Sequence, residues 1–153
     1  MHLSEVIRPE IVWPDLKALT KQEVIRELAH NIAQSLGASD ENNLAEILSE
    51  REQLGSTGIQ DGIAIPHGKI PGLKQIIIAC GRSVAGIDFD SHDSKPTHLF
   101  FVLLAPEFAA GQHLKALARL SRLLKDESFR QKLLTAGGRE AMYNSITAED
   151  KKL

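Results

Sequence analysis

A histidine framed by proline and glycine is the feature of this sequence best suited to chemistry. Pro66-His67-Gly68 lies at the end of residues 50–69, which read EREQLGSTGIQDGIAIPHGK. Two isoleucines alternate with smaller residues just before it, and this pattern predicts a short buried strand that runs out at His67. Proline constrains the backbone on one side and glycine leaves room on the other, so a large group can approach the ring. This framing suits a nucleophilic imidazole, although a lone histidine is more often a plain polar residue in a loop, and the residues alone leave both interpretations open.

The common phosphate-binding loops do not explain the glycines of this stretch. The run that ends at Gly68-Lys69 has Ile63 and Ile70 where a P-loop needs a glycine and a hydroxyl. No spacing within it matches the dinucleotide-binding glycine pattern either. The stretch is therefore not a nucleotide cradle.

Two further side chains could meet an anion at His67. Arg51 is expected on or beside the buried edge of the preceding helix, where it is either a cation favourable to the helix dipole or a guanidinium aimed at a phosphoryl group. His113 falls in the first turn of a later helix, where it is either a plain surface residue or part of an anion site with the helix amides. If the fold brings His113 beside His67, the pair forms a phosphate site.

Caps and hydrophobic periodicity predict the elements that must position these residues. Thr20 to Glu23 reads as a capping box before a helix that Gly37 ends, and Ser39 or Asp40 can cap a second helix. Three more helices are expected after residue 111, the second of them capped by Asp126. Strands are expected at residues 11–13, 63–65, 76–80, 87–90 and 99–104. This order predicts one α/β domain over residues 1–153, a mixed β-sheet flanked by helices on both faces.

Composition limits the functions that are open. The 153 residues are 42% apolar, enough for one core, and the net charge of -2 gives no electrostatic argument for nucleic acid. The single cysteine, Cys80, reads as a small core residue in a reducing compartment. His92 and His98 have no spacing with it that suits zinc, so no metal is expected. We expect a cytoplasmic protein, because no stretch suits a membrane span or signal peptide.

The residues around His67 resemble a known family. The string LGSTGIQDGIAIPHGK, preceded by Glu50-Arg51-Glu52 and followed by IDFD and by an HL pair opening a late helix, is similar to the IIA domain of the fructose and mannitol type. These domains belong to the bacterial phosphoenolpyruvate-dependent phosphotransferase system. Within this family the resemblance is to the free-standing nitrogen-regulatory branch. It also implies an α/β sandwich.

The resemblance implies a mechanism as well. A histidine phosphocarrier protein donates a phosphoryl group to Nε2 of His67, the tele nitrogen, and no metal or other cofactor takes part. An imidazole is mostly uncharged at neutral pH, so it can attack phosphorus without a general base. The added negative charge then needs cations and hydrogen-bond donors. The groups expected to supply them are Arg51, His113, the hydroxyls of Ser56 and Thr57 and, as a secondary candidate, Lys69.

Two functions remain open for such a protein. As a regulator, its phosphorylation state is read by target proteins such as kinases or transporters; as a sugar-specific component, it relays the phosphoryl group to a membrane permease. We expect a phosphotransferase component that acts mainly as a regulator. The N-terminal region and the motif resemble that branch, and these residues hold no permease or second phosphocarrier domain. A binding module without phosphotransfer is favoured only if His67 is inert.

Overall fold

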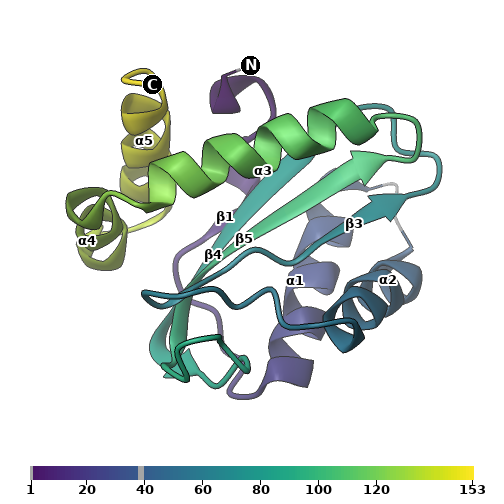
Figure 1. The fold of residues 1–153 in the computed structure, drawn as a ribbon, viewed down its shortest axis with the longest axis horizontal. Helices are drawn as coiled ribbons and strands as arrows, with labels where there is room; N and C mark the ends of the chain where they lie inside the picture. The colour runs from purple at the N-terminus through teal and green to yellow at the C-terminus, as the bar shows by residue number, and fades with distance from the viewer. Residues whose placement is uncertain (1, 38–39) are drawn as a thin grey trace.

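The protein folds around one mixed β-sheet (Figure 1). The structure is a computed structural model and describes residues 2–37 and 40–153. The strand order is β1 (Val12–Trp13), β4 (Ile77–Ile87), β5 (Thr97–Pro106) and β2 (Ile63–Ala64), and β3 (His67–Ile70) also pairs with β5. The central pair β4 and β5 is antiparallel, whereas the outer strands run parallel to their neighbours.

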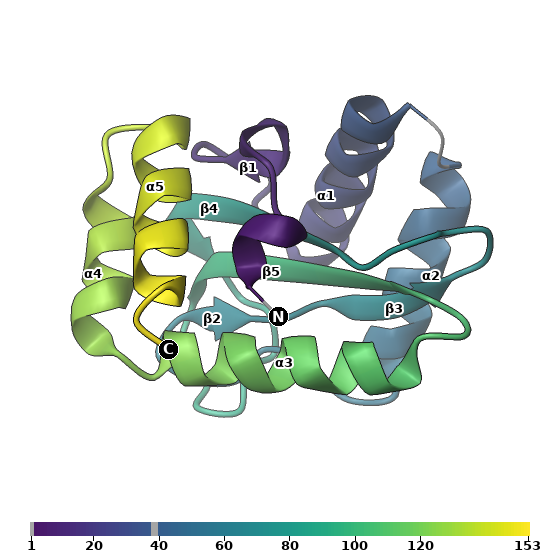
Figure 2. The ribbon, with the colours of Figure 1, turned by 90° about the horizontal axis from the view of Figure 1, so that it is seen from above.

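Helices cover both faces of this sheet. α1 (Lys21–Leu36) and α2 (Glu41–Gln53) lie on one face, and α3 (Ala110–Leu124), α4 (Glu127–Thr135) and α5 (Arg139–Asp150) lie on the other (Figure 2). Side chains of β5 alternate between them: Phe101 and Leu103 join the core beneath α3, and Phe100 and Val102 join the core beneath α1. The predicted mixed sheet with helices on both faces is confirmed.

Side-chain caps start the helices where the sequence predicts. The Thr20 hydroxyl accepts a hydrogen bond from the Glu23 amide at 3.2 Å, and the Asp126 carboxylate accepts one from the Phe129 amide at 3.3 Å. Asp40 caps α2 through the Asn42 amide at 3.0 Å. Its alternative, Ser39, lies outside the described residues. The Asp40 cap sets where α2 begins, and so the position of Arg51 in its last turn.

The strand predicted at residues 87–90 is wrong. Ile87 is instead the last residue of β4, and Asp90 has a φ of +55°, which an extended strand does not allow. β4 extends well past Cys80 because buried Arg82 finds acceptors within the fold. Its guanidinium donates to the Leu133 carbonyl at 2.9 Å and to the Ala136 carbonyl at 2.8 Å. The pairing of this arginine with distant carbonyls is not visible in local periodicity.

The edge strand that carries the histidine is broken into two pieces. β2 and β3 both pair with β5, and they are separated by Ile65 and Pro66. The Pro66 carbonyl still accepts the Leu103 amide at 2.9 Å, so the interruption is local. His67 therefore begins a second strand, rather than following the end of the first as the sequence predicted.

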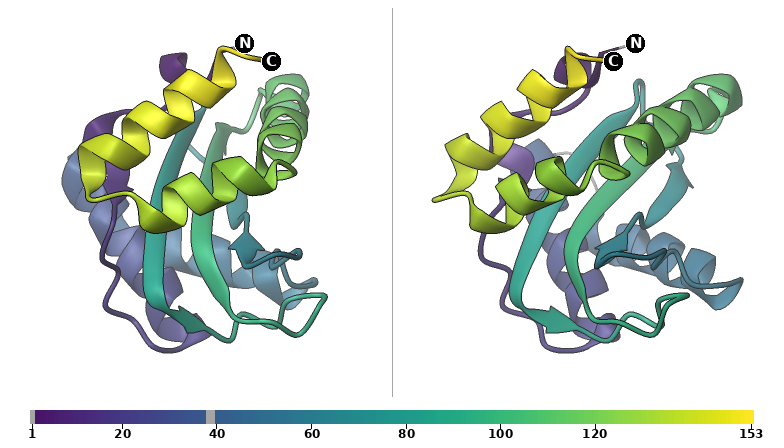
Figure 3. Two further views of the ribbon diagram at one scale, coloured as in Figure 1. Left: turned by 90° about the vertical axis from the view of Figure 1, so that its left-hand side faces the viewer. Right: turned by 60° about the vertical axis from the view of Figure 1, so that its left-hand side comes forward.

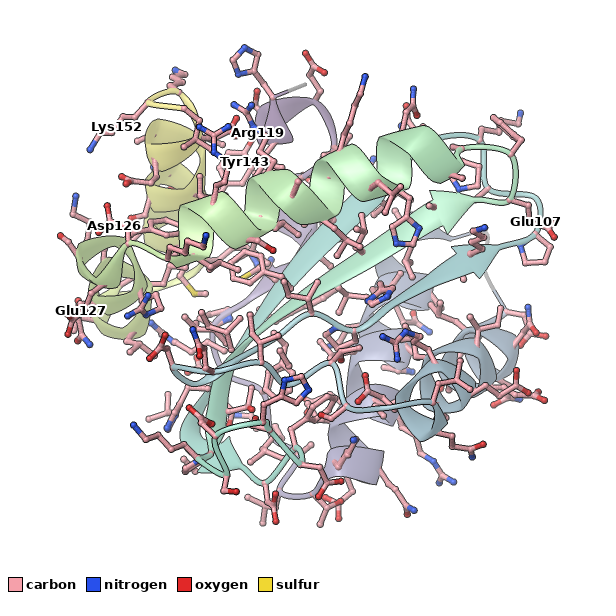
Figure 4. The ribbon with its side chains drawn as sticks, in the orientation of Figure 1. Glu107, Arg119, Asp126, Glu127, Tyr143 and Lys152 are labelled. Carbon is pink, nitrogen blue, oxygen red and sulfur yellow. The ribbon has the colours of Figure 1, made fainter. Side chains whose placement is uncertain are left out.

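The two ends of the chain meet beside α3 (Figure 3). The Leu3 amide donates to the buried carboxylate of Asp150 at 2.7 Å. Arg119 extends from α3 toward α5, where it donates to the Asp150 carbonyl at 3.0 Å (Figure 4). Within the described ranges, the helices are all too short or too polar to cross a membrane.

Candidate functional site

The hydrogen bonds of His67 define which ring nitrogen is available. Its Nδ1 lies 2.8 Å from the carbonyl oxygen of Ile65. A carbonyl oxygen only accepts hydrogen bonds, so Nδ1 carries the proton and Nε2 keeps its lone pair. The ring is half-buried at the start of β3. Nε2 is therefore the ring nitrogen whose lone pair faces the surroundings.

Arg51 points at that lone pair from the last turn of α2. Its Nε donates to Nε2 of His67 at 3.2 Å, and its Nη1 donates to the Gly55 carbonyl at 2.9 Å. The first bond is possible only if Nε2 is unprotonated, so two independent contacts define the same tautomer. Of the two interpretations of Arg51, the structure supports a side chain directed at the histidine.

His113 reaches the ring of His67 from α3, on the opposite face of the sheet from α2. It lies in the first turn of α3, and its ring meets the ring of His67 edge-on with centroids 5.4 Å apart. His113 is 9% exposed, and this burial lowers its pKa, with the nearby His67 and Lys69 adding to the effect. The structure thus brings together two histidines that are far apart in the sequence and holds the second one neutral.

These side chains face an open hollow of about 670 Å³. Its lining also includes Lys69 of β3 and residues of α2. Apolar side chains also line it: Leu54, which is 85% exposed, and Ile47 of α2. The site is therefore a polar centre with an apolar border, which suits a protein partner.

The hydroxyls of Ser56 and Thr57 donate hydrogen bonds to groups away from the hollow. Ser56 donates to the Phe89 carbonyl at 2.7 Å, and Thr57 donates to the carboxylate of Glu52. Neither residue lines the hollow at His67. A role in binding phosphate would require both hydroxyls to leave these partners.

Sequence reasoning missed Glu52. Its carboxylate is buried one position after Arg51, although the sequence gives it no role beyond its place in the family motif. The sequence signal was a carboxylate in the last turn of a helix, where the macrodipole disfavours it.

The remaining candidates for metal binding lie apart from the hollow. Nδ1 of His98 is 2.9 Å from the Ser83 carbonyl, and Cys80 is fully buried in β4. His92 is exposed in the loop before β5. Over residues 2–37 and 40–153, the structure has no cluster of three histidine, cysteine or acidic side chains that could hold a metal ion.

Fold and site together define a class of protein. A neutral histidine with an available Nε2, beside a guanidinium and open to a partner, has the geometry of a domain that can carry an anionic group on histidine. The model of the family described as "Phosphoenolpyruvate-dependent sugar phosphotransferase system, EIIA 2" matches residues 5–149. The chain belongs to this family.

Relatives come from both branches of the family. The chain is 42% identical over 146 residues to a nitrogen regulatory protein of Bradyrhizobium diazoefficiens, covering 95% of each. It is 36% identical over 151 residues to a fructose-specific EIIABC component of Bacillus subtilis, of which it covers 24%. The crystal structure of nitrogen regulatory protein IIA-Ntr from Neisseria meningitidis superposes with a TM-score of 0.88 at 33% identity, covering 95% of this chain and 99% of that one.

Proposed function

We propose that this chain is a phosphohistidine-carrying regulator of the nitrogen-related phosphotransferase system. His67 accepts a phosphoryl group on Nε2 from a histidine phosphocarrier protein, and partner proteins in the cytoplasm respond to its phosphorylation state. The observation that carries the proposal is the pair of contacts on the ring: Nδ1 to the Ile65 carbonyl at 2.8 Å and Arg51 Nε to Nε2 at 3.2 Å. They leave one ring nitrogen unprotonated and beside a cation.

The transfer needs no proton to move between the two proteins. The Nε2 lone pair of His67 forms the new P–N bond, and the electron pair of the breaking P–N bond returns to the ring nitrogen of the donor. The proton on Nδ1 stays in its bond to the Ile65 carbonyl, which also stabilises the positive charge that the ring gains. A donor ring protonated on its other nitrogen leaves as neutral imidazole.

Arg51 has to change partners during this reaction. In the structure it occupies the lone pair of Nε2 with a weak 3.2 Å bond, so a phosphorus atom displaces it. The guanidinium can then turn its N–H groups to the phosphoryl oxygens while Nη1 remains on the Gly55 carbonyl. His113 and Lys69 lie on the same hollow and can meet the remaining oxygens.

The regulatory function is favoured over sugar transport by the relatives. The nitrogen regulatory protein of Bradyrhizobium is 42% identical to this chain, whereas the fructose-specific component is 36% identical. The second relative still keeps a sugar-specific relay open, because it aligns with 99% of this chain. The two functions differ in whether a membrane permease component receives the phosphoryl group from His67.

Intact mass measurement tests the proposed function. The purified chain is incubated with the phosphocarrier proteins and phosphoenolpyruvate-dependent kinases of its own organism. We expect an acid-labile gain of one phosphoryl group that His67→Ala abolishes and that His92→Ala, a change in an exposed loop, leaves intact. A full gain in the His67→Ala protein contradicts the assignment. Rapid onward transfer to a sugar-specific IIB protein, with no phosphorylation-dependent partner, favours the relay.

A further inference from the structure

The buried carboxylate of Glu52 binds the loop that contacts His67. Glu52 is 8% exposed and accepts hydrogen bonds from the Thr57 amide at 3.0 Å and from the Thr57 hydroxyl. Nζ of Lys21, at the start of α1, lies 3.0 Å from Oε1 of Glu52, the oxygen that also accepts the Thr57 amide. One carboxylate therefore ties α1, the end of α2 and the glycine-rich loop together.

Stability alone does not explain a carboxylate at this position. Glu52 lies in the last turn of α2, where the helix dipole disfavours negative charge. Burial of a carboxylate also costs free energy unless partners replace the lost water. Glu52 is thus unfavourable both for its place in the helix and for its burial, and it needs Lys21 of another helix to offset these costs. A residue of this kind is a candidate for a functional role.

The loop that Glu52 holds reaches both nitrogens of His67. Thr57, fixed by Glu52, accepts the Ile65 amide on its own carbonyl at 3.0 Å. The Ile65 carbonyl in turn accepts the proton of His67 Nδ1 at 2.8 Å.

The other ring nitrogen is reached through the start of the same loop. The Gly55 carbonyl holds Nη1 of Arg51 at 2.9 Å, and Nε of that arginine contacts Nε2 of His67. Residues 55–57 thus form a common support for the proton on one ring nitrogen and the cation at the other.

We propose that Glu52 is a positioning residue for phosphoryl transfer at His67, acting through Thr57 and neutralised by Lys21. It does not touch the phosphoryl group. It holds the loop so that the Ile65 carbonyl selects the Nδ1–H tautomer of His67. The same loop keeps the guanidinium of Arg51 beside Nε2. This inference rests on the proposed function and assigns the two loop hydroxyls, Ser56 and Thr57, to holding the loop in place.

Ser56 and Lys21 strengthen the same support. The Ser56 hydroxyl donates to the Phe89 carbonyl at 2.7 Å, and the ammonium of Lys21 lies 4.6 Å from the centre of the Phe89 ring. Lys21 also reaches Asp90 at 3.4 Å. Residues 89–90, before β5, therefore hold the loop together with Glu52, and Lys21 contacts both.

Glu52→Gln tests the proposal, because it keeps the shape of the side chain but removes the charge that pairs with Lys21 and replaces the oxygen that accepts from the Thr57 hydroxyl with an amide donor. Misplacement of reacting groups by about 1 Å can cost on the order of a hundredfold in rate, so we expect phosphorylation of His67 to slow by ~10- to 100-fold at saturating donor. The apparent affinity for the donor should stay the same. Ring ¹⁵N NMR should show part of the His67 population shifted to the Nε2–H tautomer.

The matched control is Glu27→Gln. Glu27 of α1 also holds a loop through backbone amides, those of Lys17 at 2.9 Å and Ala18 at 2.8 Å, but it does not line the hollow at His67. We expect its transfer rate and His67 tautomer to match the wild type. An equal slowing in Glu27→Gln means general loosening of the fold and overturns the proposal.

Thr57 supplies a second pair of variants in case Glu52→Gln does not fold. Thr57→Val keeps the shape and loses the hydroxyl, so it should slow transfer, and Thr57→Ser should restore it. Wild-type rates in both variants, or an unchanged tautomer in Glu52→Gln, overturn the inference. If the wild-type chain takes no phosphoryl group at all, the proposed function fails, whereas the NMR comparison still decides whether Glu52 positions the ring.

Discussion

The ring of His113 stands at 88° to the ring of His67, with 5.4 Å between the ring centroids. This contact buries His113 at the start of α3 and keeps a second potential cation close to the reactive one. Protonation of both rings at once is unfavourable at this separation. An anion that reaches the hollow would favour the protonated form of His113.

His113 should make the protein less stable in mild acid. Burial lowers its pKa in the folded state, whereas an unfolded histidine has a pKa of about 6.5. The contribution of His113 to stability is therefore complete above that value, and it is lost as the pH falls through it toward the lower folded pKa. In the His113→Gln protein, the free energy of unfolding should therefore depend less on pH below about 6.5. Urea unfolding at a series of pH values measures this profile. His92→Gln, in an exposed loop, should leave the profile as it is; an unchanged profile in His113→Gln contradicts the prediction.

Phosphorylation of His67 should reverse the shift at His113. A phosphoryl group adds close to two negative charges beside a ring that now faces His67 and Lys69. Negative charge favours the protonated form of a neighbouring imidazole, so the pKa of His113 should rise on phosphorylation. An NMR titration of the His113 ring in the free and phosphorylated protein measures this change. A pKa that stays low shows that His113 does not face the phosphoryl group.

Much of the framework was predictable because it depends on local chemistry. The caps at Thr20, Asp40 and Asp126 and the helical spacing of apolar residues do not need the rest of the fold. The motif around His67 was sufficient to suggest Arg51 and His113 as its neighbours, and both contact its ring in the structure.

What the sequence did not predict depends on partners far along the chain. Arg82 lies inside β4 because carbonyls of residues 133–136 accept its protons. Glu52 can be buried because Lys21 reaches it from another helix. Thr57, expected at the phosphate, instead turns its hydroxyl to Glu52. Each of these polar groups satisfies its hydrogen bonds across the tertiary structure, which periodicity does not record.

Arg51→Lys should slow phosphorylation of His67 while the fold survives. Lysine keeps the charge but lacks the planar fork that lets Nη1 hold the Gly55 carbonyl while Nε faces the ring. Loss of one well-placed donor to a developing charge costs roughly a hundredfold, and the retained charge should limit this to about tenfold or more. Single-turnover transfer from the phosphorylated donor measures the rate. Arg26→Lys, on the exposed face of α1, serves as the control. Equal rates in all three proteins leave Arg51 with only a structural role.

Cys80 should be inert in the folded protein. It is fully buried, and this burial raises the pKa of its thiol to about 12, although nearby Arg82 acts in the opposite direction. Thiol reagents attack the thiolate, so labelling near neutral pH should require unfolding. The rate of reaction with a chromogenic disulfide, followed with and without denaturant, checks this prediction. Fast labelling of the native protein contradicts it.

The phosphorylation state should change which proteins bind the surface around His67. The exposed side chain of Leu54 lines the hollow together with His67, so a partner that covers this leucine also covers the ring. A phosphoryl group on His67 must then lose water on binding, which is costly unless the partner supplies a cation. We expect at least one partner to bind the unphosphorylated protein more tightly, with His67→Asp weakening binding less than phosphorylation because a carboxylate carries less charge. Affinity measurements with wild type, His67→Ala, His67→Asp and the phosphorylated protein test this. Equal affinities for every partner in all four forms exclude regulation through this surface and favour the sugar-specific relay.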